Sequence, residues 1–166
     1  DEMSITWDSR PLAEVDPIGR WWIWYDNCAD APKVGINADP ALARTVVAEA
    51  AGDGLLSVRL HSPGYWTSYY SREHAEAADR PQLIVYYRPT QDIELEPVAD
   101  AYVSSSSPGT NYGDSEDLEV RPDTETSFLR FDVAGVVPAD TVFAHATLRA
   151  VSNCGHAYGG DGNVYT

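Results

Sequence analysis

The stretch "SFLRFDV", residues 127–133, alternates apolar with polar side chains and so has the two-residue period of a β-strand. Nine further short runs share this alternation, are rich in Val, Ile, Tyr, Trp or Thr, and are bounded by Gly, Pro, Asp or Asn. They lie at 3–9, 20–26, 55–62, 66–71, 82–87, 100–105, 117–122, 142–151 and 163–166. About ten strands separated by turn signals predict an all-β fold, a jelly-roll-like antiparallel β-sandwich.

Two stretches depart from this pattern. Residues 39–54, "DPALARTVVAEAAGDG", open on Asp-Pro, are rich in Ala, Leu and Glu, and end at Gly, which predicts one short helix. Residues 89–97 hold two prolines and three acids with little alternation, so they are predicted to link two β-rich parts, 1–88 and 98–166.

The charge of the chain is strongly negative. Its 26 acidic residues outnumber 11 basic ones, of which only Lys33 is a lysine, and the formal net charge is −15. Such a surface repels the phosphates of nucleic acids and anionic lipid headgroups, and no run approaches the roughly 20 apolar residues of a membrane span. These observations exclude nucleic acid and membrane insertion and favour a secreted or cell-surface protein.

The two cysteines, Cys28 and Cys154, lie far apart in polar contexts, and neither has the spacing of metal ligands. We expect one disulfide between them; the alternative is two buried free thiols. Calcium is the other candidate stabiliser, since the loops 111–119 and 159–163 are dense in hard oxygen ligands. The candidate calcium ligands are Asp114, Glu116, Asp117 and Asp161. Neither loop matches EF-hand spacing, so solvated acidic loops remain the alternative.

Aromatic side chains are candidates for stacking on sugars, whose apolar faces pack on rings. Trp22 and Trp24 share one face of the run 20–26, while Tyr65 and Trp66 follow a Pro-Gly turn and are the better exposed candidates. Burial of these rings in the core is the alternative interpretation.

Catalysis has little support, because the chain lacks a G-x-S-x-G elbow, an H-E-x-x-H pair and a phosphate-cradling Gly-Lys loop. We therefore predict that the protein is not an enzyme. Arg72, Glu73 and Arg80 are interpreted as a hydrogen-bonded structural clamp next to the strand at 82–87.

Several short motifs together resemble the DNRLRE-type domain, the group that includes family 96 carbohydrate-binding modules. These motifs are Asn111-Tyr112-Gly113, Arg130-Phe131-Asp132, Ala146-Thr147-Leu148-Arg149, Ile5-Thr6-Trp7, Ser71-Arg72-Glu73 and Pro81-Gln82-Leu83. The resemblance implies that 98–166 is the N-terminal half of a sandwich and 1–88 the C-terminal half, joined in reversed order.

Reversed halves leave three arrangements open: a unit of a tandem array, a subunit whose halves pair with those of neighbours, or a circular permutant that closes on itself. A half-sandwich alone exposes strand edges, so pairing across copies is favoured. The predicted function is therefore a structural repeat that self-assembles into an extracellular fibre, stalk or array, with an assembly core of Trp7, Phe128, Phe131 and Leu148. The alternative is a carbohydrate-binding module for a neutral or anionic polysaccharide.

Overall fold

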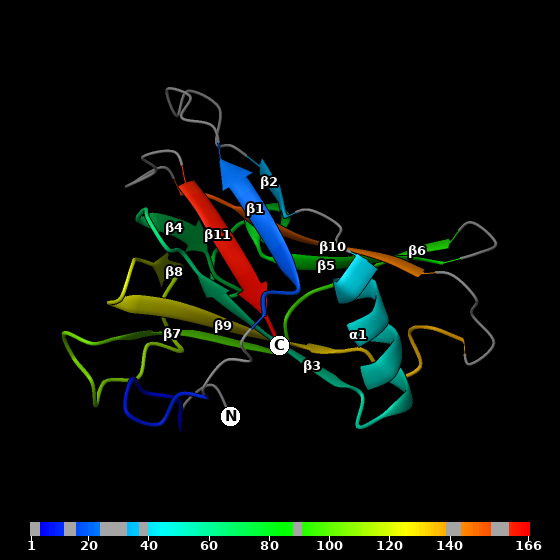
Figure 1. Cartoon of the computed structure of the whole chain (residues 1–166), viewed down its shortest axis with the longest axis horizontal. Coiled ribbons are helices and arrows are strands. Elements are labelled where there is room, and N and C mark those ends of the chain that lie inside the picture. The colour runs from blue at the N-terminus through cyan, green and yellow to red at the C-terminus, as the bar shows by residue number, and fades with distance from the viewer. Residues whose placement is uncertain are drawn as a thin grey trace.

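The structure, a computed structural model, describes residues 4–11, 16–23, 33–36, 40–87, 91–138, 144–153 and 160–166. Within these ranges it contains eleven strands, one α-helix, α1 (Pro40–Ala51), and a short 3-10 turn, η2 (Ala77–Asp79) (Figure 1). The strands are β1 (Gly19–Ile23), β2 (Lys33–Ile36), β3 (Leu55–His61), β4 (Thr67–Tyr70), β5 (Gln82–Tyr87), β6 (Gln91–Leu95), β7 (Ala99–Ser104), β8 (Asp117–Val120), β9 (Glu125–Asp132), β10 (Ala144–Val151) and β11 (Gly160–Tyr165).

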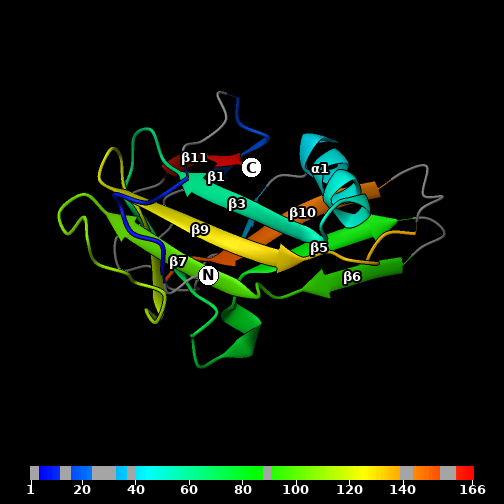
Figure 2. The same ribbon diagram turned by 90° about the horizontal axis from the view of Figure 1, so that it is seen from below.

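The strands form two main sheets and a ribbon, and all of their pairings are antiparallel. The five-stranded sheet has the order β1-β11-β3-β9-β7, the four-stranded sheet β2-β10-β5-β6, and β4 pairs with β8. Figure 1 shows β1 beside β11, and Figure 2 shows β3, β9 and β7 as neighbours. The predicted all-β antiparallel sandwich with one short helix is confirmed.

The core lies between the two main sheets and follows from the alternation in their strands. Leu56 and Val58 of β3 stand opposite Phe131 and Leu129 of β9, and all four are at most 2% exposed. The four-stranded sheet faces them with buried side chains of β5 and β10, namely Leu83, Val85, Ala146 and Leu148. Because successive strand residues point to opposite faces, every second residue enters this core.

Strands from 1–88 and from 98–166 are neighbours in each sheet. In the five-stranded sheet β3 lies between β11 and β9, and in the four-stranded sheet β10 lies between β2 and β5. The ribbon joins β4 to β8 in the same way. The two parts of the chain therefore complete each other's sheets inside one molecule.

Helix α1 begins at Pro40, where a proline has the fixed φ that a first helical turn needs, and covers part of the core. It packs against β10 and β3 and buries Leu42, Ala43 and Val46. After the helix, the N–H groups of Gly52 and Gly54 donate to the carbonyl oxygen of Glu49 at 3.0 and 2.9 Å. These bonds satisfy the end of the helix and turn the chain into β3.

Gly54 is the glycine at this turn that a side chain cannot replace. Its φ is +80°, and an added Cβ would lie 2.7 Å from the Cβ of Ala134. We expect Gly54→Ala to lower the free energy of unfolding by about 1–3 kcal/mol, measured by urea denaturation. Gly109→Ala is the matched control, because nothing lies within 4 Å of its added Cβ. Equal stability of the two variants would contradict the prediction.

Three segments differ from their predicted structure. Residues 4–9 hold a turn closed by the Ser9 N–H donating to the Thr6 carbonyl at 3.2 Å, rather than a strand. The segment 89–97, predicted to be a linker, contains β6, whose Ile93 and Leu95 pack against the core while its acids face outward. β6 is an edge strand, where exposed charge is favourable, and the flanking prolines conceal its short alternation. The strand β2 was not predicted.

Candidate functional site

The five-stranded sheet turns one face to the core and leaves the other, here called the outer face, toward solvent. In antiparallel sheets, directly paired residues point to the same side. Arg59 pairs with Tyr165 and with Phe128, His61 pairs with Asn163, which pairs with Arg20, and Ser57 pairs with Arg130. The outer face includes the pair Leu55 and Asp132 at the end of β3 and β9, and the following residues: Arg20, Ser57, Arg59, His61, Phe128, Arg130, Asn163 and Tyr165.

Contacts between neighbouring strands hold two arginines of the outer face in place. The Arg59 guanidinium lies 4.3 Å from the ring centroid of Tyr165. The Arg130 Nε donates to the Ser57 Oγ at 3.2 Å. Guanidinium groups held in this way present their remaining N–H donors to an approaching ligand at low cost in side-chain entropy.

The positive charge of the outer face comes from its arginines. Burial lowers the pKa of His61, and the nearby Arg59 lowers it further while Asp123 opposes them, so this histidine is uncharged at neutral pH. Burial also lowers the pKa of Arg59, with a smaller lowering from Arg10. Three of the chain's 11 basic residues thus share one sheet face, and Arg10 stands close to it.

A pocket of about 290 Å³ opens at the β9 and β7 side of the outer face. Its floor includes Ser57, Phe128 and Arg130 together with Ala99 and Ala101 of β7. Its wall is the segment Ser4–Pro11, which lines the pocket with Ser4, Ile5, Ser9 and Pro11. Figure 2 shows this segment in dark blue beside β9 and β7.

The wall is tied to the loop that follows β7. The Asn111 Nδ2 donates to the Ile5 carbonyl at 2.7 Å, and the Asp8 N–H donates to the Pro108 carbonyl at 3.3 Å. Within the wall, the Arg10 guanidinium lies 3.6 Å from the ring centroid of Trp7 and donates to the Trp7 carbonyl. Chemically, the site combines fixed guanidinium groups, an aromatic floor and several hydroxyls, which suits a ligand with both an apolar face and anionic groups.

The predicted stacking residues Tyr65 and Trp66 lie away from this pocket, next to the ribbon β4-β8. Tyr65 is 45% exposed. Trp66 is half-buried: its Nε1 donates to the Glu119 Oε2 at 2.6 Å, and the Arg121 guanidinium lies 3.6 Å from its ring centroid. One face of Trp66 is therefore occupied by a side chain of the protein itself, and their role in sugar stacking stays a prediction.

Three other predicted residues fall outside the described part of the chain. Trp24, Cys28 and Cys154 belong to ranges of which the structure gives no placement. Trp22 lies in β1, where its backbone pairs with that of Asp161 in β11. The disulfide between Cys28 and Cys154 stays a prediction.

Among the described residues, the predicted calcium ligands do not form a cluster. Asp114 and Glu116 are exposed, and the Asp117 Oδ1 accepts a hydrogen bond from the Asn153 Nδ2 at 2.8 Å. Among the described residues, no three His, Cys, Asp or Glu side chains are placed to hold a metal ion. A calcium ion that also uses Asp161 stays a prediction.

The residues of the predicted assembly core separate into two environments. Phe131 and Leu148 are at most 1% exposed and lie in the core. Phe128 lies on the outer face instead, and Trp7 lies in the wall under Arg10. The physical reason is strand geometry, since residues three apart in β9 point to opposite faces of the sheet.

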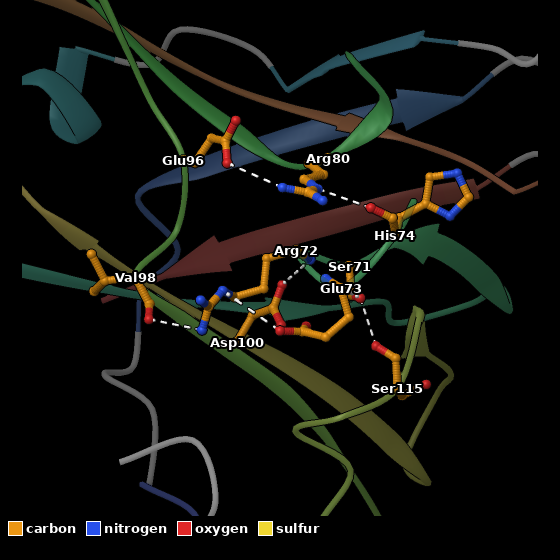
Figure 3. Close-up of polar contacts among 9 residues, drawn as sticks. All are labelled: Ser71, Arg72, Glu73, His74, Arg80, Glu96, Val98, Asp100 and Ser115. Carbon is orange, nitrogen blue, oxygen red and sulfur yellow. Dashed lines mark hydrogen bonds and ion pairs between the residues drawn. The ribbon is translucent and has the colours of Figure 1, made fainter. Parts of the chain in front are cut away.

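The three predicted clamp residues tie the loop after β4 to β7 and the segment before it (Figure 3). The Arg72 N–H donates to the Asp100 Oδ2 at 2.9 Å, and its Nη1 donates to the Val98 carbonyl at 3.0 Å. The Arg80 Nε donates to the His74 carbonyl at 2.9 Å, and its Nη1 lies 3.6 Å from the Glu96 Oε2. Glu73 lies 3.6 Å from the Arg72 Nε.

The sequence of the region from β6 to β11 is similar to a known protein family. Residues 91–164 match carbohydrate-binding module family 96. The match confirms the resemblance over this region, and strands from residues 4–87 complete the same sheets from outside the matched range. No curated protein and no solved structure matches the chain. Of the outer face, Phe128, Arg130 and Asn163 lie inside the family 96 match.

Sequence reasoning missed Arg20, Arg59, Arg130 and Tyr165 as a site. The sequence signal for this site lies in two runs, "SVRLHS" and "SFLRFDV". In each run an arginine occupies one of the polar positions of an alternating strand. Any solvent-facing strand shows the same pattern, so each run alone predicts only a surface. The register between β3 and β9 is what assembles the runs into one site.

Proposed function

We propose that this protein is a carbohydrate-binding module that recognises an anionic polysaccharide through the outer face of its five-stranded sheet. The observation that carries the proposal is the gathering of Arg20, Arg59 and Arg130 on the outer face of a chain whose net charge is −15. The family 96 match of residues 91–164 supports carbohydrate as the ligand class.

The charge distribution favours an acidic rather than a neutral glycan. The net negative charge of the protein already keeps it soluble, so solubility does not explain why arginines collect on one face. A bound carboxylate or sulfate would interact favourably with these arginines. A guanidinium binds such groups with two parallel hydrogen bonds, and the ring of Phe128 offers an apolar surface for a sugar face.

The expected result of removing these charges is a loss of affinity without a loss of fold. Arg59→Gln and Arg130→Gln should each weaken binding about tenfold or more, the value of a charge-assisted hydrogen bond. Isothermal titration calorimetry against polygalacturonate, alginate and hyaluronate, with neutral xylan for comparison, measures the effect. Affinity should fall steeply with added salt.

Arg44→Gln is the matched control, since Arg44 is exposed on α1 and its loss changes the net charge equally. An equal loss of affinity in all three variants would show a non-specific charge effect. Tight binding of xylan that is unchanged in Arg59→Gln would refute an anionic ligand. Absence of binding to every polymer would refute the proposed function.

A carbohydrate-binding role makes this a binding protein rather than an enzyme, acting where polysaccharide is found, outside the cell. No helix in the described ranges is long and apolar enough to cross a bilayer. The predicted fibre was inferred from halves that need a neighbour; because β3, β9, β10 and β5 pair within one chain, that reasoning no longer supports self-assembly.

A further inference from the structure

We propose that the outer face recognises the end of a polysaccharide chain, with the terminal sugar seated in the pocket against the segment Ser4–Pro11. This inference rests on the proposed function and specifies which part of the polymer is bound.

The outer face is open on one side and closed on the other. From β1 across β11 and β3 to β9, its rows of paired residues span about 14 Å at the usual spacing of strands. On β7 the row that contains Arg59 and Phe128 ends at Ala101, which points to the same side as Phe128 yet is only 2% exposed. The segment Ser4–Pro11 lines the pocket there, opposite Ala99 and Ala101 of β7.

The wall is a fixed part of the structure. Its hydrogen bonds from Asn111 to the Ile5 carbonyl and from Asp8 to the Pro108 carbonyl attach it to the loop after β7. A polymer lying along the rows from β1 therefore meets the wall at the pocket over β9 and β7 and cannot continue past it. A chain terminus meets no such obstacle.

The pocket supplies what a terminal acidic sugar needs. Phe128 gives an apolar floor, Arg130 a cation held by Ser57, and Ser4 and Ser9 line the wall. Its volume of about 290 Å³ is at the small end of ligand pockets, which suits one terminal unit rather than a continuous chain. Arg59 and Arg20 then lie on the open side, toward the following sugars.

Chain length tests this inference with the wild-type protein. An anionic polymer from the titrations above, polygalacturonate, alginate or hyaluronate, is cut by partial acid hydrolysis and compared with the intact polymer at equal mass. If ends are bound, cutting the mean length tenfold lowers the half-saturating mass concentration about tenfold, because ligand is counted by termini. An unchanged or higher half-saturating mass concentration overturns chain-end recognition.

A pocket-filling pair of variants gives the second measurement. Pro11→Trp adds a ring at the wall, and Pro63→Trp adds the same ring at an exposed turn that does not line the pocket. Binding of the short oligosaccharides should fall at least about tenfold in Pro11→Trp and stay unchanged in Pro63→Trp. Wild-type affinity in both variants overturns the pocket.

The results of these experiments distinguish a failure of chain-end recognition from a failure of the proposed carbohydrate-binding function. If the intact polymer binds through Arg59 and binding does not depend on the number of chain ends, the carbohydrate-binding function stands and chain-end recognition is refuted. Failure of every polymer to bind removes both.

Discussion

Replacing Phe131 by alanine is expected to lower the free energy of unfolding by about 3–5 kcal/mol. Phe131 is fully buried between the sheets and stands opposite Leu56 of β3. Truncation removes the ring and leaves a cavity that packed neighbours such as Leu129 fill only in part. Urea denaturation followed by tryptophan fluorescence measures the change, and a loss below about 1 kcal/mol would contradict the assigned core.

Phe128→Ala is the matched control, three residues away in the same strand. Its ring lines the pocket on the outer face rather than the core, so the loss of stability should be clearly smaller than for Phe131→Ala. Binding should show the reverse order: Phe128→Ala weakens polysaccharide binding, and Phe131→Ala, where folded, retains it. Identical behaviour of the two variants would mean that β9 does not separate core from ligand face.

The second large effect concerns Asp100, a carboxyl group that is 3% exposed beside the clamp residues Arg72 and Glu73. The pKa of Asp100 is raised to about 8, chiefly by burial and also by the Glu73 carboxylate, while the backbone N–H and the charge of Arg72 oppose the rise. An unfolded aspartate has a pKa near 3.9. Between these two values the folded state keeps a proton that the unfolded state has lost.

The sign of the pH dependence follows from this difference. The stabilising contribution of the protonated Asp100 is complete below about pH 4 and is lost as the pH rises toward about 8. For this group alone, the free energy of unfolding falls by up to about 1.4 kcal/mol for each pH unit in that window. The protein should therefore lose stability from mildly acidic to mildly alkaline pH.

Asp100→Asn removes the titration and keeps an oxygen that accepts the Arg72 N–H. We expect this variant to be more stable than wild type at pH 8 and to have a flatter profile between pH 4 and pH 8. Denaturation from pH 4 to pH 9 measures it, with exposed Asp114→Asn as the control that keeps the wild-type slope. A wild-type slope in Asp100→Asn would show that Asp100 ionises normally.

Strand alternation was the part of the fold that local sequence decided. The runs at β3, β5, β9 and β10 were predicted because apolar residues at every second position have only one buried arrangement in a sheet. The helix α1 was marked by Pro40 at its start and glycines after its end. β6 and β2 were missed, since short runs such as "DIEL" carry too few alternating residues.

The sequence by itself therefore determined most of the segments that become strands and, through alternation, that Phe128 and Phe131 point to opposite faces of β9. Only the tertiary structure decided which strands become neighbours. Register placed Arg59 beside Tyr165 and Phe128, which come from strands distant along the chain. Hydrogen bonds to the loop after β7 brought Ser4–Pro11 to the edge of the pocket. The physical reason is that strand period is a local property of the backbone, whereas pairing and register depend on the burial of the whole core at once.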